Sequence, residues 1–242
     1  METWRLDNQT IFETGPLQEY LAALRFASRC EGAEQRLVLA VGDPGVGKTV
    51  GARVFRQESG CSPLYINLPS EQLLRPRDLL CIIADRLGCG SDFRSRYDFA
   101  RYLCDDSLRS PRLLLFDNAQ SLRKYDWLDM LRWIHDEGGH TFVLIGTHSL
   151  EQTFLEHREF AGRVALRHQV RIPTAEEIRP LFPEFPAEAV EQIHEETGGR
   201  MRQVISLRRR LFELIEARKL DVSDLAPKQV RMVARHFLVK AA

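Results

Sequence analysis

The chain has 242 residues, 44% hydrophobic and 28% charged, which fits a folded protein with one main core and room for a smaller second domain. Lysine plus arginine and aspartate plus glutamate each number 34, so the net charge is zero and overall basicity gives no argument for a nucleic-acid partner. Any anion-binding site must therefore be local.

The pattern of the five cysteines and the N-terminal sequence indicate the cellular compartment of the protein. The cysteines are odd in number and form no Cys-x-x-Cys pair, which argues against a disulfide scaffold or a zinc site. The N-terminus lacks an apolar signal core, and no apolar run approaches the roughly 18 residues of a membrane span. We therefore expect a cytoplasmic protein in a reducing environment, with no membrane partner.

Strand and helix patterns alternate over the first 172 residues. A helix is expected after Thr14-Gly15-Pro16, where apolar residues recur at helical spacing. Short apolar runs predict buried parallel strands at 37–41, 64–68, 113–116, 142–145 and 170–172, and helices are expected between them, notably at 77–87 and 126–137. This order predicts an α/β fold with a doubly wound, five-stranded parallel sheet.

Only helices are expected after Ile172. Pro173 and a capping box of Thr174 with Glu177 begin this region, and helices are predicted at 187–197, 200–218 and 227–240. We place a domain boundary here, with an α/β domain over 1–172 that includes an entry segment over 1–35. A small all-helical domain covers 173–242.

One segment matches a phosphate-binding motif. Gly42-Asp43-Pro44-Gly45-Val46-Gly47-Lys48-Thr49 fits Gly-x-x-x-x-Gly-Lys-Ser/Thr, between a predicted strand and a predicted helix. The glycines let backbone N–H groups and the helix N-terminus face phosphates, while Lys48 neutralises their charge and the Thr49 hydroxyl ligates magnesium. No Asn-Lys-x-Asp guanine signature occurs, so residues 42–49 predict ATP and Mg²⁺ as the bound groups. A glycine-rich turn without a ligand is the alternative, and the flanking elements argue against it.

A second half of the site is expected where another buried strand ends. Asp117 follows Leu113-Leu114-Leu115-Phe116 and is predicted to hold the magnesium shell, although a strand-terminal Asp can also cap a loop. Asn118 stands where ATPases of this kind place the glutamate that polarises the attacking water. An amide orients water but does not accept its proton, so slow hydrolysis is expected.

These motifs resemble the AAA+ ATPases and, within them, the MuB, TnsC and TniB-like regulators of DNA transposition. The resemblance covers nearly the whole chain and rests on segments in a fixed order: Ile11-Phe12-Glu13-Thr14, the phosphate loop, Asp117-Asn118-Ala119-Gln120, Leu144-Ile145-Gly146-Thr147, Phe160-Ala161-Gly162-Arg163-Val164 and Thr197-Gly198-Gly199-Arg200-Met201-Arg202. The ordered set is specific to AAA+ proteins, and the transposition assignment rests on weaker overall similarity.

The resemblance implies three further roles. Thr147 would be sensor 1, a polar group at the γ-phosphate or its water; its alternative is a cap for the next segment. Arg163 would be an arginine finger for a neighbouring subunit's nucleotide, with Arg158 and Arg167 as competitors and a surface ion pair as the alternative. Arg202 would be sensor 2, although it could also be a solvated residue at a helix start.

The resemblance also implies DNA contacts that do not read bases. Segments after the second and third strands would line a channel, and a third cluster interleaves arginines with aromatic residues. The residues concerned are Arg75, Arg77, Arg94, Arg96, Arg101, Arg123 and Lys124, each of which could instead be a solvated surface charge.

Together these features predict an ATP-dependent AAA+ ATPase that binds duplex DNA without sequence specificity. It would form a homo-oligomer, as a ring or a helical filament, and deliver target DNA to a transposase. Two alternatives are an ExeA-like secretion or envelope-assembly ATPase, which would normally need a membrane span, and a nucleotide-gated signalling switch without DNA.

Overall fold

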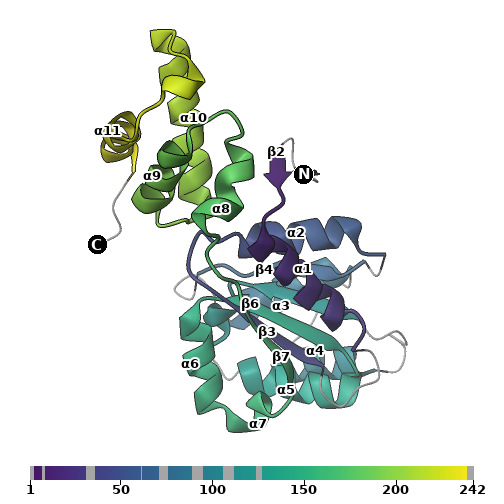
Figure 1. Ribbon diagram of the computed structural model, residues 1–242. Helices are drawn as coiled ribbons and strands as arrows, with labels where there is room; N and C mark the ends of the chain where they lie inside the picture. Colours follow the sequence, from purple (N-terminus) through teal and green to yellow (C-terminus); the bar gives the residue numbers. More distant parts are fainter. Residues whose placement is uncertain are drawn as a thin grey trace. The chain divides into compact units, whose positions relative to one another are not determined.

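The computed structural model describes residues 3–6, 9–30, 36–60, 62–70, 76–88, 95–105, 112–123 and 127–238. Residue contacts divide the chain into two compact units, drawn together in Figure 1. The larger unit contains Glu19–Gly42 and Lys48–Gln169, and the smaller one contains Met1–Gln18, Asp43–Gly47 and Val170–Ala242. The domain boundary at residue 173 remains a prediction.

The larger unit is built on a five-stranded parallel sheet. Its strands lie in the order β4-β5-β6-β3-β7, with bounds β3 Leu37–Val41, β4 Leu64–Asn67, β5 Leu113–Asp117, β6 Thr141–Gly146 and β7 Val164–Gln169. Every residue of β3, β5 and β6 is buried, which is why these strands read as continuous apolar runs. The predicted α/β fold with a doubly wound parallel sheet is confirmed.

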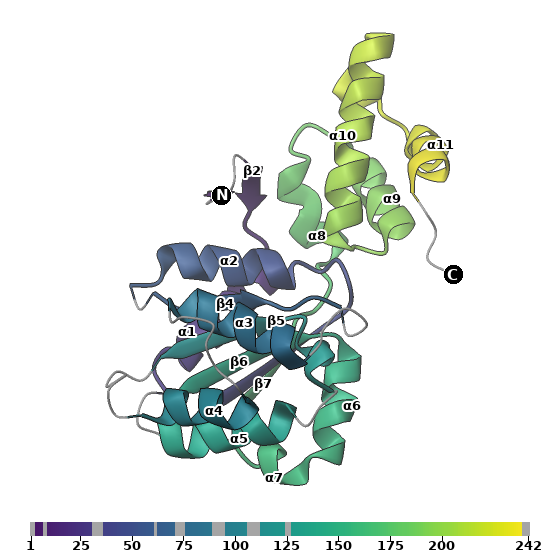
Figure 2. The same ribbon diagram turned by 180° about the vertical axis from the view of Figure 1, so that it is seen from behind.

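Helices cover both faces of this sheet. Figures 1 and 2 show α1 (Gly15–Ala27) and α2 (Lys48–Glu58) on one side, and α3 (Pro76–Leu87), α4 (Arg96–Cys104) and α5 (Trp127–Gly138) on the other. A short η2 (Ala119–Arg123) follows β5, while α6 (His148–Glu156) and α7 (Arg158–Ala161) connect β6 to β7. Side chains such as Phe116, Trp127 and Phe142 fill the core on the α3 to α5 side.

The smaller unit combines a hairpin with helices. The hairpin pairs β1 (Thr3–Leu6) with β2 (Gln9–Phe12), and the helical elements are α8 (Ala175–Ile178), η3 (Arg179–Leu181), α9 (Ala187–Thr197), α10 (Met201–Arg218), η4 (Val222–Asp224) and α11 (Pro227–Phe237). Phe12 packs against the helical core, and the Arg208 guanidinium lies 5.5 Å from the centre of its ring. The predicted capping box of Thr174 and Glu177 is formed.

The last strand of the sheet is not where the sequence pattern places it. The prediction at 170–172 is wrong, because the strand is β7, Val164–Gln169. This strand lies at an edge of the sheet and is half-exposed, so its polar Arg167, His168 and Gln169 break the apolar run that marks the buried strands. The hairpin was also not expected. None of the helices in the described part of the chain combines the length and the apolar character that a membrane span requires.

Candidate functional site

Three neighbouring strands bring the predicted site residues to one edge of the sheet. Val41 at the end of β3 is in register with Gly146 of β6, and Asp117 at the end of β5 is in register with Ile145. The Gly42 N–H donates to the Gly146 carbonyl at 3.2 Å, which extends the pairing by one residue. Gly42, Asp117 and Thr147 therefore all lie at the carboxyl edge, where ligands bind in open α/β sheets.

The phosphate loop adopts a glycine-dependent backbone. Gly45 and Gly47 have φ values of 86° and 106°, which side-chain-bearing residues rarely adopt. At Gly47 an added Cβ would meet no atom within 4 Å, so the requirement there is conformational rather than steric. The Lys48 Nζ donates to the Gly42 carbonyl at 2.7 Å and so bridges the two ends of the loop.

The helix that follows the loop presents a favourable end for anions. Helix α2 begins at Lys48, and no acidic side chain stands in its first turn. The backbone N–H groups of a first helical turn and the helix dipole favour negative charge at such a terminus. Thr49 is exposed in this turn, while Lys48 is half-buried.

Asp117 is a buried carboxylate held by two neutral donors. Only 1% of its surface is exposed. The Tyr65 hydroxyl donates to its Oδ2 at 2.7 Å, and the Asn118 backbone N–H donates to its Oδ1 at 2.9 Å. Burial first, and then the nearby Asp117 charge, raises the pKa of the Tyr65 phenol, so this hydroxyl remains a donor at neutral pH. The Asp117 carboxylate and the Thr49 hydroxyl offer the oxygen ligands that Mg²⁺ prefers.

Asn118 is exposed at the start of the turn after β5. Its φ is 59°, in the left-handed region that asparagine tolerates better than most residues. Its side-chain amide donates to Asn67 Oδ1 at 2.9 Å, and its carbonyl accepts the Ser121 N–H at 3.0 Å. Asn118 therefore shapes the turn and also presents an amide beside Asp117.

Thr147 occupies the first position after β6, between the strands that carry Gly42 and Asp117. It is the N-cap residue of α6, but its side chain makes no capping hydrogen bond. Its hydroxyl instead lies 2.8 Å from the Ser149 hydroxyl. Capping by the side chain thus does not account for this threonine.

Arg202 lies beside the phosphate loop within the smaller unit. Its backbone N–H donates to the Gly45 carbonyl at 3.2 Å. A Cβ added to Gly45 would lie 3.6 Å from the Arg202 Cβ and 3.9 Å from the Arg200 Cβ. The Arg202 side chain is exposed at the second position of α10.

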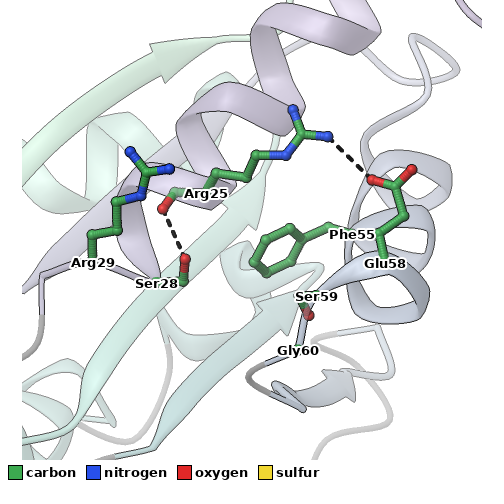
Figure 3. A pocket seen from close by; sticks show the side chains of 7 residues that line it. All are labelled: Arg25, Ser28, Arg29, Phe55, Glu58, Ser59 and Gly60. Carbon is green, nitrogen blue, oxygen red and sulfur yellow. Dashed lines mark hydrogen bonds and ion pairs between the residues drawn. The ribbon is translucent and has the colours of Figure 1, made fainter.

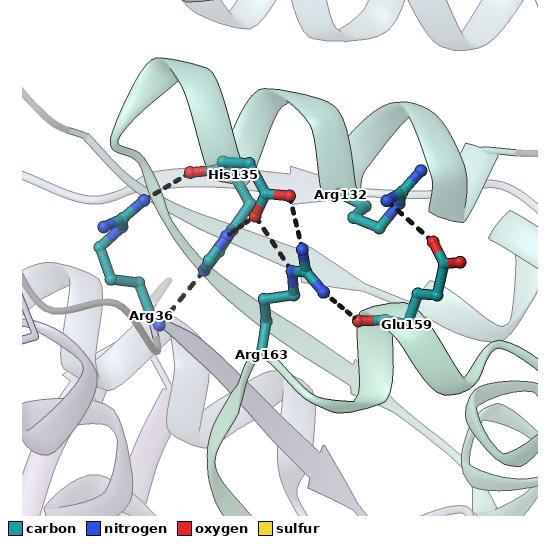
Figure 4. A network of polar contacts seen from close by, with 6 residues as sticks. Arg36, Arg132, His135, Glu159 and Arg163 are labelled. Carbon is teal, nitrogen blue, oxygen red and sulfur yellow. Dashed lines mark hydrogen bonds and ion pairs between the residues drawn. The ribbon is translucent and has the colours of Figure 1, made fainter.

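Arg163 lies at the edge where the strands begin, opposite the carboxyl edge that carries Asp117. Its carbonyl accepts the N–H of Leu37, the first residue of β3, at 3.3 Å. Its guanidinium binds both oxygens of Asp136, at 3.1 and 2.8 Å, and donates to the Glu159 carbonyl at 2.5 Å (Figure 4). The Arg163 guanidinium is the main cause of the lowered pKa of Asp136. The structure thus does not bring Arg163 together with the nucleotide-loop residues of its own chain.

The network around Arg163 extends to the start of β3. His135 Nδ1 lies 2.9 Å from Asp136 Oδ1, and His135 Nε2 accepts the Arg36 backbone N–H at 3.3 Å (Figure 4). Burial lowers the pKa of His135, which favours a neutral ring that accepts at Nε2 and donates at Nδ1. The sequence reasoning missed Asp136, which is 27 positions from Arg163 and carries no motif.

Arg158 and Arg167, the two other candidates for the arginine finger, differ in their contacts. Arg167 forms an ion pair with Glu151. Arg158 is exposed at the start of α7. Among the described residues, no charged partner is seen for Arg158.

The predicted DNA contacts are only partly described. Arg75, Arg94 and Lys124 lie outside the described residues. Arg77 and Arg96 belong to α3 and α4, but their side chains are not described. Arg123 is exposed at the end of η2, in the segment that follows β5.

A surface pocket of about 170 Å³ lies at the C-terminal ends of α1 and α2 (Figure 3). Phe55 lines it, and Arg25 pairs with Glu58 at its rim at 3.1 Å. The lining residue of α2 that is nearest to Lys48 is Phe55, seven positions further along the helix, which is about 10 Å at a rise of 1.5 Å per residue. The pocket is therefore distinct from the phosphate loop.

The comparisons with known proteins agree with this geometry. The fold and the loop define a P-loop α/β domain of the AAA+ ATPase type. A model of the AAA domain family matches residues 31–154, and the chain belongs to this family. No curated protein matches the chain.

Solved structures share the fold at low sequence identity. The Aeropyrum pernix ORC2 protein, solved as ADPNP–ADP complexes, is 14% identical with a TM-score of 0.69, over 93% of this chain and 68% of that one. Cdc6p from Pyrobaculum aerophilum is 15% identical with a TM-score of 0.68, over 95% and 69%. The Thermotoga maritima RuvB Holliday junction branch migration motor is 18% identical with a TM-score of 0.58, over 91% and 68%.

Proposed function

We propose that this protein is an ATP-dependent AAA+ ATPase that binds duplex DNA without sequence specificity. In this proposal it assembles on DNA as a homo-oligomer, such as a helical filament, and delivers that DNA to a transposase. The observation that carries the nucleotide part is the meeting of the phosphate loop's start, Asp117 and Thr147 at one edge of the sheet.

The phosphate loop binds ATP in this account. The N–H groups of residues 42–49 and the open N-terminus of α2 surround the phosphates, and Lys48 exchanges its contact with the Gly42 carbonyl for phosphate oxygens. Thr49 and Asp117 hold Mg²⁺, which when bound offsets the charge on the phosphates. The ADP and ADPNP in the ORC2 structures support a nucleotide ligand for this fold.

Hydrolysis is slow in this proposal, because the chain supplies an amide at the position of the usual base. Asn118 and Thr147 orient the attacking water by hydrogen bonds, but neither side chain accepts a proton at neutral pH. The contacts that bind ATP do not depend on Asn118. Tight binding with slow turnover gives long-lived ATP-bound assemblies.

Arg163 completes a neighbouring subunit's site. It lies at the edge of the sheet opposite its own Asp117, which suits a residue that acts on another chain. A guanidinium supplied from a neighbour stabilises the charge that develops on the transferred phosphoryl group. Nucleotide binding and assembly are thereby linked.

The helical region of the smaller unit acts as a lid. Arg202 serves as sensor 2, and its backbone contact with Gly45 supports a place near the nucleotide. The charge of its exposed side chain is available to a phosphate. The position of α10 then depends on whether ATP or ADP is bound.

DNA is bound by its phosphates in this proposal. The contacts come from Arg75, Arg77, Arg94, Arg96, Arg123 and Lys124, which neutralise phosphates without reading bases. The structural likeness to RuvB, a Holliday junction branch migration motor, supports a nucleic-acid role. The transposase as recipient rests on the resemblance to the transposition regulators.

Electron microscopy of the protein with ATP and random-sequence duplex DNA tests this proposal. Filaments or rings on the DNA are expected with wild-type protein, and none with Lys48→Ala. ATP-dependent oligomers that ignore DNA would favour a signalling switch. Binding to lipid vesicles instead of DNA would favour an envelope-assembly ATPase.

A further inference from the structure

The hydroxyl of Tyr65 makes a contact with Asp117 that no sequence motif predicts. Tyr65 lies on β4, two residues before Asn67, which is in register with Asp117 on β5. Because side chains alternate along a strand, Tyr65 shares a sheet face with the position opposite Asp117. Its hydroxyl spans the gap and donates to Asp117 Oδ2 at 2.7 Å.

Asp117 depends on such donors because it is almost fully buried. A buried carboxylate is costly unless hydrogen bonds stabilise its charge. Over the described residues, no arginine, lysine or histidine forms an ion pair with Asp117. The Asn118 backbone N–H holds Oδ1 at 2.9 Å, and the Tyr65 hydroxyl holds Oδ2.

The two donors have different consequences for the carboxylate. The Asn118 contact comes from the next residue along the chain, so it moves with Asp117. The Tyr65 contact comes from a separate strand and therefore fixes the rotation of the carboxylate against the sheet. Both donors are neutral, so they orient the two oxygens without cancelling the negative charge. The carboxylate charge therefore remains available to a cation.

Tyr20 on α1 supplies a natural comparison. It is fully buried, and its hydroxyl has no hydrogen-bond partner among the described residues. Its ring stacks on His168 at a centroid distance of 5.8 Å. Tyr20 thus places a second buried phenol in the same unit without the bond that Tyr65 makes.

We propose that Tyr65 is a positioning residue for Mg²⁺ binding, because its hydroxyl orients the Asp117 carboxylate from the neighbouring strand. The inference rests on the proposed role of Asp117 in the magnesium shell. Without the hydroxyl, the carboxylate loses one of two donors and rotates more freely. Mg²⁺ binding must then also restrict the rotation of that carboxylate, and this entropic cost weakens Mg²⁺ binding.

The test is the Mg²⁺ dependence of nucleotide binding in Tyr65→Phe, with Tyr20→Phe as the matched control. A fluorescent ATP analogue is titrated at fixed Mg²⁺ concentrations and also in excess EDTA. We expect Tyr65→Phe to raise the half-saturating Mg²⁺ concentration about tenfold, the scale of one hydrogen bond to a charged group. Its affinity in EDTA should match that of the wild type, and Tyr20→Phe should match the wild type in both conditions.

Asp117→Asn separates the two possible failures. If Asp117→Asn weakens Mg²⁺-dependent binding and Tyr65→Phe does not, the positioning role is wrong and the magnesium role of Asp117 stands. If Asp117→Asn leaves the Mg²⁺ dependence unchanged, the proposed role of Asp117 fails and this inference fails with it.

A second measurement does not require Tyr65→Phe to fold. The chain has five tyrosines, so the wild-type protein labelled with fluorotyrosine gives five ¹⁹F signals. The other four are assigned by Phe substitutions at Tyr20, Tyr97, Tyr102 and Tyr125. Adding Mg²⁺ to the ATP-bound protein should shift the remaining Tyr65 signal more than that of Tyr97, and an unmoved Tyr65 signal would overturn the proposal.

Discussion

The side-chain amide of Asn118 donates to Asn67 Oδ1 at 2.9 Å, so the residue after Asp117 is tied to the neighbouring strand β4. This bond fixes an amide at the edge where the phosphate loop begins. The left-handed φ of 59° at Asn118 is part of the same turn. A glutamate at position 118 would therefore place a carboxylate at this edge, but its backbone would have to adopt the less favourable left-handed conformation.

Asn118→Glu is expected to raise the DNA-stimulated ATPase rate by about 100-fold, the lower end of the range for a general base. Glutamate supplies the proton acceptor that asparagine lacks, and the Asn67 amide can turn to donate to it. The left-handed backbone should lower the unfolding free energy by about 1 kcal/mol. Rates are therefore measured per folded molecule.

Asn118→Gln is the matched control, because it has the length of glutamate without the charge. Its rate should stay at the wild-type level or below. Equal rates for wild type, Asn118→Glu and Asn118→Gln would show that another residue acts as base. A change confined to the melting temperature would support a purely structural role for Asn118.

The partners of these site residues could not be found from the sequence. The loop and Asp117 were predictable, because each follows a continuous apolar strand within a recognisable motif. Tyr65 is 52 positions from Asp117, and Asn67 is 51 positions from Asn118. Their contacts depend on the pairing of β4 with β5, which no local pattern specifies.

Arg163→Ala should spare ATP binding but impair assembly or hydrolysis. It removes the guanidinium offered to the neighbouring subunit, and also the ion pair with Asp136. Both side chains of that pair are partly exposed, at 32% and 33%, which limits the loss of stability to about 1 kcal/mol. Sedimentation with ATP and DNA measures assembly, and a phosphate-release assay measures turnover.

Arg158→Ala and Arg167→Ala are the controls for this prediction, because both arginines lie within five residues of Arg163. They should assemble and hydrolyse ATP like the wild type. If Arg163→Ala behaves normally and one of these two variants is defective, the arginine replaced in the defective variant is the arginine finger.

The contribution of Glu177 to stability should be lost in acid. Arg171, which binds both carboxylate oxygens at 2.7 and 2.6 Å, is the first cause that lowers the pKa of Glu177 from 4.5 to about 2. A lowered pKa in the folded state means that the charged form stabilises the fold above pH 4.5 and loses this effect as the pH falls toward 2. Chemical denaturation of wild type and Glu177→Gln measures the difference.

Glu177→Gln should be less stable than the wild type by about 1 kcal/mol at pH 7, since it weakens both the capping box and the ion pair. The gap should close below pH 4.5. A gap that stays constant down to pH 2 would contradict the charge-based account.

The fold was largely predictable where burial imposes a pattern. The three central strands are buried throughout and carry continuous apolar runs, and the helix at Ala187–Thr197 ends at Gly198 in the left-handed conformation that glycine favours. Strand β7 was misplaced because an edge strand keeps polar residues. The hairpin β1 to β2 was missed because its short strands carry mixed polar and apolar residues, and their pairing depends on each other.

DNA binding should lose its salt dependence in step with the charges removed. Replacing Arg75, Arg77, Arg123 and Lys124 by alanine should lower the slope of log K against log salt by about one unit per lost phosphate contact. All duplex sequences should be weakened alike. A control set of equal charge, Arg209, Arg218, Arg235 and Lys228, should leave the slope unchanged. An unchanged slope in the first set would place the DNA surface elsewhere, with Arg94, Arg96 and Arg101 next to test.

The retention of the protein on random-sequence duplex DNA, with ATP, with ADP and without nucleotide, tests the central claim most directly. We predict strong retention with ATP, weak retention in the other two conditions, and a steep loss as salt rises. Lys48→Ala should remain unretained in all three, while Lys228→Ala should behave like the wild type. Retention that is equal with and without ATP, or unaffected by Lys48→Ala, would contradict a nucleotide-controlled DNA-binding protein.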